Sequence, residues 1–203
     1  YKIFGPGNQY VTVAKQLATK YGVAIDMPAG PSELLVVADD SANAAFVASD
    51  LLSQAEHGVD SQVILVSTSE KLVTDVTAEI KKQLQVLPRK DIAEKSIANS
   101  KLILLSTDAQ ALALIDEYGP EHFIVCTENE EFYTQNVSNA GSVFIGNYTP
   151  ESAGDYASGT NHTLPTNGYA KQYSGVNLDS FMKSMTFQKI SAEGIQRIGG
   201  AIE

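Results

Sequence analysis

Short apolar segments alternate along the chain with longer segments in which apolar residues recur at helical spacing. The segment 33–38 (ELLVVA) is apolar from Leu34 to Ala38, which is typical of a buried strand. The alternation predicts an α/β fold with a largely parallel sheet flanked by helices. Strands are expected at 33–38, 62–67, 101–106, 123–126 and 142–146, and helices at 43–54, 71–87, 90–99, 109–118 and 131–135.

The two ends of the chain follow other patterns. A short N-terminal strand precedes Gly5, and a helix is expected to begin near Gln9. Residues 147–175 are rich in Gly, Ser, Thr, Asn, Pro and Tyr and have little periodicity, so a long loop is expected there. A loop of this length inside a compact domain is usually functional or disordered. Beyond it, 178–182 is helix-like, 185–190 is strand-like and 193–202 is helical.

Composition removes several classes of protein. The 203 residues hold 14 Lys and Arg against 24 Asp and Glu, a formal net charge of −10, and no basic stripe points to nucleic acid. No apolar run approaches ~18 residues, so no membrane span is expected. The single cysteine, Cys126, excludes an internal disulfide framework and agrees with a reducing compartment, here expected to be the cytoplasm. Its apolar setting predicts a core residue, which argues against a thiohemiacetal mechanism.

Each of the three histidines lies in a polar or Gly-rich setting. Gln54 and His57 are three residues apart at the end of a predicted helix, so they share a face and could offer an amide oxygen and an imidazole nitrogen to one cation. The alternative is an ordinary polar helix end capped by Gly58. Both interpretations remain open from this segment alone.

Two further settings carry candidate chemistry. Glu121 and His122 follow a Gly-Pro pair, and a carboxylate beside an imidazole suits proton abstraction, although an exposed turn is equally compatible. Asp155 and His162 lie in the predicted long loop, where Asp155 could serve as a hard metal ligand. Turn chemistry is the alternative there, since Asp, Asn, Ser and Gly all favour turns.

Two Gly/Pro-rich segments could approach a ligand. The segment 5–8 (GPGN), ending at Asn8, precedes a helix N-terminus, which suits a phosphate or a nicotinamide ribose, although it is not a GxGxxG motif. Ser32 precedes a strand and could make one hydrogen bond to a ligand. A rigid connection is the usual role of such a segment.

Five motifs occur in one order, and together they resemble the histidinol dehydrogenase family. They are the segments 2–8, 25–33, 49–57, 118–122 and 150–162. The resemblance covers nearly the whole chain. It implies a zinc-bound homodimer that oxidises L-histidinol through L-histidinal to L-histidine, the last step of histidine biosynthesis, with two NAD per turnover.

The resemblance also implies roles for individual residues. Gln54, His57 and Asp155 match the zinc ligands of the family and Glu121 and His122 its acid–base pair. Ser32 matches a substrate contact, and the ligand residues and His122 would also contact the substrate. Asn8 matches an NAD contact, and His162 receives a supporting role near the substrate.

The chain departs from the family in two respects. The family's fourth zinc ligand is a histidine of the partner subunit near the C-terminus, and no histidine follows His162 here. The N-terminal part of the family is also missing, and the chain lacks an initiator Met, so we expect a catalytically silent piece of a longer enzyme. Expected units are a remnant of a second Rossmann-like domain (1–32), an incomplete Rossmann-like domain with the zinc and acid–base residues (33–176), and a helical extension (177–203). The alternatives are a metal-dependent hydrolase and a non-catalytic α/β interaction module.

Overall fold

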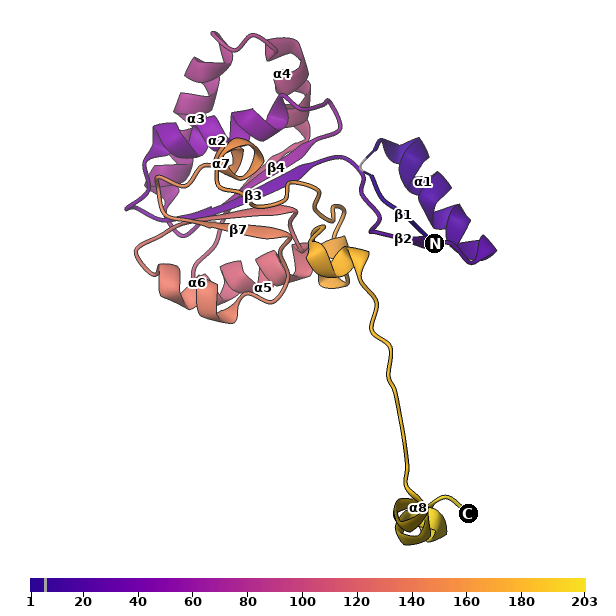
Figure 1. Cartoon of the computed structure of the whole chain (residues 1–203). Coiled ribbons are helices and arrows are strands. Elements are labelled where there is room, and N and C mark those ends of the chain that lie inside the picture. Colours follow the sequence, from indigo (N-terminus) through magenta and orange to yellow (C-terminus); the bar gives the residue numbers. More distant parts are fainter. Residues whose placement is uncertain (6) are drawn as a thin grey trace.

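A five-stranded parallel sheet organises the computed structural model, which describes residues 1–5 and 7–203 (Figure 1). Its strands are β3 (Glu33–Ala38), β4 (Gln62–Ser67), β5 (Lys101–Leu104), β6 (His122–Cys126) and β7 (Ser142–Ile145). They lie in the order β5-β4-β3-β6-β7, and every neighbouring pair is parallel. The predicted fold class is therefore confirmed.

Helices cover both faces of this sheet (Figure 1). On one face lie α2 (Ala44–Ala55), α3 (Glu70–Leu84) and α4 (Lys90–Asn99), and on the other lie α5 (Asp108–Tyr118) and α6 (Glu130–Asn136). Side chains alternate between the faces of a strand, so Leu34 and Val36 of β3 join one core cluster while Leu35 and Val37 join the other. This explains the continuous apolar run at 34–38, because both faces of the strand are buried.

Helix ends follow local side-chain chemistry. The side chain of Asn43 caps α2, that of Ser69 caps α3 and that of Thr107 caps α5. Helix α5 ends at Gly119, whose φ of 62° is the left-handed conformation that favours glycine. The Gly-Pro pair thus ends α5 directly before Glu121 and His122.

The N-terminal residues form a small unit with its own two-stranded parallel sheet. Its elements are β1 (Lys2–Ile3), α1 (Gln9–Ala18), the 3-10 helix η1 (Thr19–Tyr21) and β2 (Ala24–Ile25). The ammonium of Lys15 pairs with the buried carboxylate of Asp26, which also accepts the backbone N–H groups of Gly5 and Met27. This ion pair ties α1 to the end of β2. The strand before Gly5 and the helix from Gln9 are confirmed, while Pro6 lies outside the described residues.

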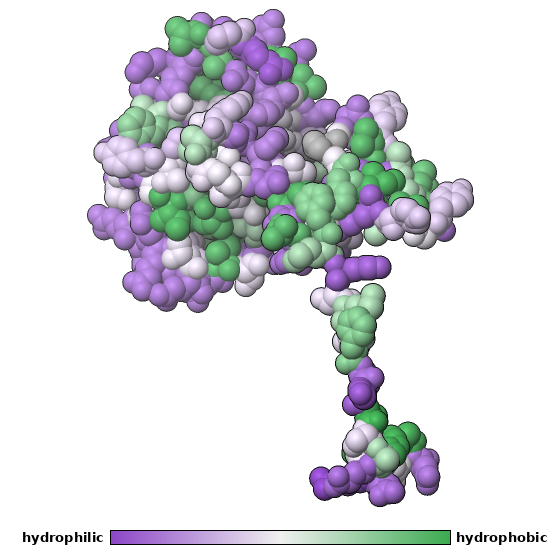
Figure 2. Space-filling view, viewed as in Figure 1, coloured by the Kyte–Doolittle hydropathy of each residue, from purple (hydrophilic) through white to green (hydrophobic). Residues whose placement is uncertain are grey.

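The C-terminal part leaves the sheet. After α7 (Glu151–Tyr156) come the 3-10 helices η2 (Tyr169–Lys171) and η3 (Leu178–Phe181), then α8 (Ala192–Ile198) and η4 (Gly199–Ala201). Residues 183–203, here called the arm, extend away from the domain and end in α8 (Figure 1). Apolar side chains of the arm face solvent, and Phe187 is 90% exposed (Figure 2).

Several local predictions were wrong. The expected loop 147–175 contains helices α7 and η2. The sequence did not predict them, because helices of six residues or fewer are too short to show periodicity. The expected strand 185–190 is extended but has no partner strand in the described chain. Helix α3 ends at Leu84, before the expected 87, and helix α2 ends with Glu56 as its C-cap, so Gly58 is not the cap. The remaining strands and helices lie within two residues of expectation.

The setting of Cys126 and the lengths of the helices bear on two further expectations. Cys126 is a buried residue of the core, and burial raises the pKa of its thiol to about 12, as expected for an unreactive cysteine. None of the helices in the described part of the chain has the length and apolarity needed to cross a bilayer.

Candidate active site

The candidate residues gather at the amino edge of the sheet. Strand β3 begins at Glu33 and β6 begins at His122, and these parallel strands are neighbours. Helix α2 follows β3 and precedes the parallel strand β4, so it must return to this same edge, which brings Gln54 and His57 there. In open parallel sheets ligands usually bind at the opposite, carboxyl edge.

The carboxyl edge is closed between β3 and β6. The backbone N–H of Asp39 donates to the carbonyl of Cys126 at 3.3 Å, and the Asp39 carboxylate accepts the N–H of Glu128 at 2.9 Å. These bonds bridge the position where the strand order reverses. The acid–base pair predicted from the sequence lies at the other edge.

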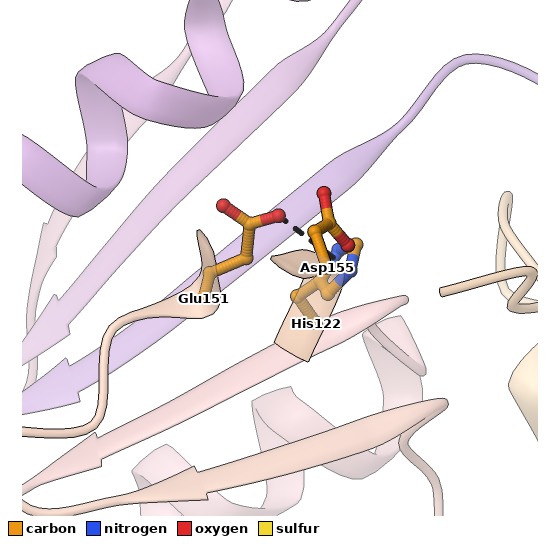
Figure 3. Close-up of side chains that lie close together, drawn as sticks. All are labelled: His122, Glu151 and Asp155. Atoms are coloured by element: carbon orange, nitrogen blue, oxygen red, sulfur yellow. Dashed lines mark ion pairs between the residues drawn. The ribbon is translucent and has the colours of Figure 1, made fainter. Parts of the chain in front are cut away.

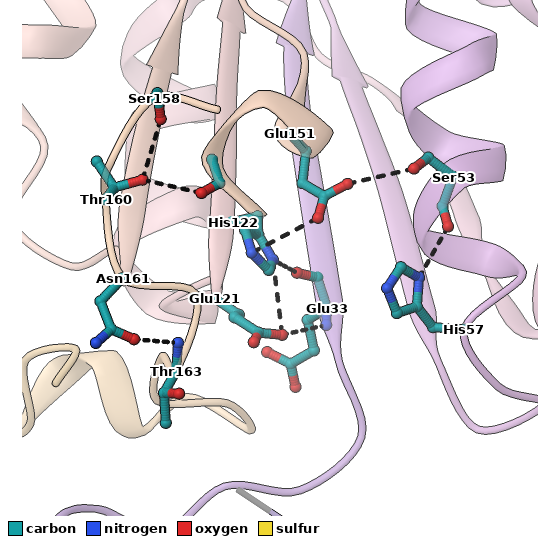
Figure 4. A network of polar contacts seen from close by, with 11 residues as sticks. Glu33, Ser53, His57, Glu121, His122, Glu151, Ser158, Thr160, Asn161 and Thr163 are labelled. Atoms are coloured by element: carbon teal, nitrogen blue, oxygen red, sulfur yellow. Dashed lines mark hydrogen bonds and ion pairs between the residues drawn. The ribbon is translucent and has the colours of Figure 1, made fainter. Parts of the chain in front are cut away.

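The backbone N–H and carbonyl of a single residue, Glu33, hold the predicted acid–base pair. The N–H of Glu33 donates to Oε2 of Glu121 at 2.9 Å, and Nδ1 of His122 donates to the carbonyl of Glu33 at 3.2 Å (Figure 4). The same Glu121 oxygen lies 3.7 Å from His122 Nδ1, and both side chains are buried. Since Nδ1 carries the proton in this arrangement, Nε2 of His122 keeps its lone pair.

Helix α7 brings two carboxyl groups to the other side of His122. Glu151 and Asp155 are four residues apart and share a face of the helix. Gly154 allows this approach, because a Cβ atom there would lie 2.8 Å from the Phe144 ring of β7. Oε1 of Glu151 lies 3.8 Å from Nε2 of His122, and the potential ligand atoms of His122, Glu151 and Asp155 all lie within 4.8 Å of one another (Figure 3).

Two residues of α2 complete the site. His57 is exposed, and its Nδ1 donates to the carbonyl of Ser53 at 2.9 Å, which leaves Nε2 available. Such a bond is how metal-binding imidazoles are usually oriented. Gln54 is 1% exposed, and neither atom of its amide has a hydrogen-bond partner within the described chain. Leaving a buried polar group unpaired costs about 1–3 kcal/mol, so this amide points to a bound ligand.

Burial dominates the electrostatics. It raises the pKa of Glu121 to about 8 and that of Glu33 to about 7, and nearby carboxylates raise the pKa of Glu121 further. Burial also raises the pKa of Glu151, and the charge of Asp155 adds to this effect. The pKa of His122 is lowered by burial. At neutral pH the imidazole of His122 is therefore neutral and able to accept a proton.

A hollow of about 400 Å³ borders this edge and brings together three of the predicted residues, Asn8, Ser32 and His57. The Asn8 side-chain oxygen accepts the N–H groups of Tyr10 and Val11 at 3.1 and 3.2 Å. It therefore caps α1, and part of the N-terminus expected to face a phosphate is already satisfied. His162 is exposed in the segment after α7.

Comparison with known proteins shows the family to which the chain belongs. A family model described as histidinol dehydrogenase matches residues 1–203. The chain belongs to the histidinol dehydrogenase family. The histidinol dehydrogenases of Bacteroides fragilis strain YCH46 and Bacteroides thetaiotaomicron are 65% and 66% identical to it over 203 residues, which are 100% of this chain and 47% of each relative.

A solved member of the family has the same fold. The crystal structure of histidinol dehydrogenase from Elizabethkingia anophelis matches with a TM-score of 0.95 and 60% identity, covering 99% of this chain and 46% of that one. The chain thus spans about half the length of the histidinol dehydrogenases it matches.

The structure groups the predicted residues in two sets. Glu121, His122 and Asp155 lie in the cluster around His122, whereas Asn8, Ser32 and His57 line the hollow. Sequence reasoning missed Glu151 and Glu33. The signal for Glu151 was its spacing of four residues from Asp155, which becomes visible only once 151–156 is known to be helical.

Proposed function

We propose that the full-length protein containing this chain is an L-histidinol dehydrogenase, which oxidises L-histidinol through L-histidinal to L-histidine with two NAD. The observation that carries the proposal is a buried carboxyl–imidazole pair held by the backbone N–H and carbonyl of Glu33, in a chain of this family. In each oxidation the substrate must lose one hydride and one proton. The neutral His122 provides a base for the proton, and NAD, when bound, supplies the hydride acceptor.

The metal would be zinc, held by Gln54, His57 and Asp155. Nitrogen and oxygen donors suit zinc. The unpaired amide of Gln54 and the available Nε2 of His57 support this assignment. Asp155 would join them from α7, where its carboxylate lies close to His122 and Glu151. When bound, zinc would supply a Lewis acid that fixes the amino and imidazole nitrogens of histidinol.

Zinc binding by the 203-residue chain can be measured by calorimetric titration beside its His57→Ala variant. We expect about one zinc per chain, with binding lost in the variant because half of the ligand pair on α2 is removed. Equal binding by both proteins would contradict the assignment of His57. A non-catalytic interaction module predicts no zinc affinity and tolerance of both His57→Ala and Asp155→Ala.

His122 would act in both oxidations. Its Nε2 takes the hydroxyl proton of histidinol as the hydride leaves the carbinol carbon, and Glu151 Oε1, 3.8 Å away, stabilises the resulting imidazolium. In the second oxidation Glu121 activates the water that hydrates histidinal. His122 again accepts the proton as the second hydride leaves. A carboxyl group whose pKa burial raises to about 8 is a stronger base, once ionised, than an exposed one.

Substrate and cofactor would meet at the hollow. Ser32 offers a hydroxyl to the substrate and Asn8 a contact to NAD, and both residues line the hollow with His57. Gln54, His57, His122 and Asp155 would also contact the substrate. His162 would support this arrangement from the segment after α7.

The active form would be a homodimer in which the partner subunit provides the fourth zinc ligand. Exposed apolar side chains along the arm support association, because such side chains are normally covered. We expect the 203-residue chain alone to be catalytically silent, since the relatives it matches are about twice as long. NADH formation from histidinol by the isolated chain would refute this expectation.

The activity test uses full-length protein with histidinol and NAD, comparing wild type with His122→Ala and with Glu117→Gln, an exposed residue, as control. We expect His122→Ala to lower kcat on the order of 10²–10⁴-fold and the control to leave it unchanged. Unchanged turnover in His122→Ala would sink the role of His122. Turnover of a substrate without NAD would instead favour a metal-dependent hydrolase.

A further inference from the structure

Glu33 is a buried carboxyl group that the proposed mechanism does not use. Its backbone nevertheless contacts both members of the acid–base pair, with the N–H on Glu121 and the carbonyl on His122. Glu33 is the first residue of β3, and the carbonyl of the preceding Ser32 accepts the N–H of Gln62 of β4 at 3.2 Å, so the sheet holds this backbone from one side. The Glu33 side chain adds a second contact at the start of the strand.

The Glu33 side chain contacts a segment far away in the sequence. Its Oε1 accepts the backbone N–H of Asn167 at 2.8 Å. Asn167 has a φ of 56° and is the only non-glycine residue of the described chain with a positive φ. A residue in this conformation persists only when its surroundings hold it there.

The segment around Asn167 is itself pinned. The neighbouring Thr166 is 2% exposed, and its hydroxyl accepts the N–H of Gly30. The carbonyl of Thr166 accepts the N–H of Tyr169, whose hydroxyl group accepts a hydrogen bond from Gln16 of α1. Asn167 therefore offers Glu33 a fixed donor.

We propose that Glu33 is a positioning residue for the acid–base pair, acting through the hydrogen bond from Asn167 to its side chain. The bond adds to the hold of the sheet on residue 33, and the backbone N–H and carbonyl of Glu33 in turn orient Glu121 and His122. This inference rests on the proposed function, in which that pair moves the protons. Moving a catalytic group by about 1 Å can lower the rate roughly 10²-fold, so the loss of one anchoring hydrogen bond should give a measurable change in kcat.

The contact requires an acceptor at the correct distance and not a negative charge. Oε2 of Glu33 is buried and has no partner among the described residues, so no cation pairs with this carboxylate. Burial raises the pKa of Glu33 to about 7, so the neutral form is well populated at neutral pH. A glutamine would keep the acceptor, whereas an aspartate would keep the charge and fall short of Asn167 by one methylene group.

The experiment compares Glu33→Gln and Glu33→Asp in the full-length protein, with Glu117→Asp as a matched shortening at an exposed position. The readouts are kcat, KM for histidinol and the thermal unfolding midpoint. We expect Glu33→Gln and the control to stay within about threefold of wild type. Glu33→Asp should lose about 10–100-fold in kcat with little change in KM, because misplaced protons slow chemistry more than binding.

The two substitutions separate a positioning role of Glu33 from a role of its negative charge. If Glu33→Asp keeps wild-type kcat while Glu33→Gln loses it, the charge of Glu33 matters and positioning is wrong. Equal losses in both variants with a lowered unfolding midpoint would assign Glu33 to stability alone. If the wild-type protein forms no NADH from histidinol, the proposed function itself is wrong, whatever the variants show.

Discussion

The backbone beside the acid–base pair leaves no room for a side chain at position 141, directly before β7. The N–H of Gly141 donates to the carbonyl of Pro120 at 2.9 Å, and the next residue, Ser142, donates to Glu121 at the same distance. A Cβ atom on Gly141 would lie 2.6 Å from the carbonyl oxygen of Glu121. Glycine is therefore required where β7 approaches the site.

This close approach makes a prediction about a single residue. Gly141→Ala should destabilise the protein by about 1–3 kcal/mol, because the backbone at Glu121 must shift to accept the methyl group. Gly199→Ala is the control, since no atom lies within 4 Å of its added Cβ. Urea unfolding of both variants measures the difference. Equal midpoints for the two variants would contradict the packing at Gly141.

Some site residues could be predicted from the sequence and others could not. Glu121 and His122 were visible because they adjoin each other after a helix-ending Gly-Pro pair. Glu33 looked like part of an apolar strand, and only the fold reveals that its backbone N–H and carbonyl contact both of them. Burial and contact between distant segments are tertiary properties, so no local pattern carries them.

Elements with strong periodicity were predictable, and short ones were not. Strands β3 and β4 were placed with the correct bounds because their apolar runs are buried by helices on both faces. Helix α7, with six residues, carries two site carboxyl groups yet resembles a polar loop in sequence. Tertiary packing against Phe144, rather than intrinsic propensity, accounts for its place.

The ion pair that ties α1 to β2 predicts a dependence of stability on pH. Burial alone would raise the pKa of Asp26, but the hydrogen bonds from Lys15, Gly5 and Met27 outweigh it and lower that pKa. A lowered native pKa means that this stabilisation is complete above the unfolded value of about 3.9 and is lost as the pH falls through the native value.

Hydrogen exchange of the α1 amides can test this dependence. Between pH 6 and about pH 3, after correction for intrinsic rates, protection of α1 should fall in the wild type, because below the unfolded pKa the opened state takes up a proton that the ion-paired Asp26 binds less readily. Asp26→Asn should show weak protection that changes little over this range. Protection of wild-type α1 that stays constant to pH 3 would argue against the ion pair as the link.

At the scale of the molecule, the domain and the arm differ in how they are stabilised. The five-stranded sheet is buried on both faces, whereas the arm exposes apolar side chains such as Phe187 and Ile202. The apolar residues at 185–190 predicted a strand, because such a pattern indicates that a segment will be buried but not which segment will cover it. The order of the strands in the sheet could not be predicted for the same reason, since it depends on contacts between distant segments.

Shortening the chain after Met182 tests this division. We expect the thermal midpoint of the domain to be unchanged, because the arm extends away from it, and self-association to decrease, because exposed apolar surface is removed. Sedimentation velocity of the two chains over a range of concentrations measures association. A lower thermal midpoint, or unchanged association, would contradict this account of the arm.

We propose that His122 serves both oxidations while Glu121 serves only the hydration of histidinal. The number of NADH formed per histidinol consumed by full-length wild-type protein and by Glu121→Gln separates these roles. We expect two NADH with histidine as product for the wild type, and about one NADH with histidinal accumulating for the variant, because water activation is lost. Two NADH per histidinol at wild-type rate in Glu121→Gln would contradict it.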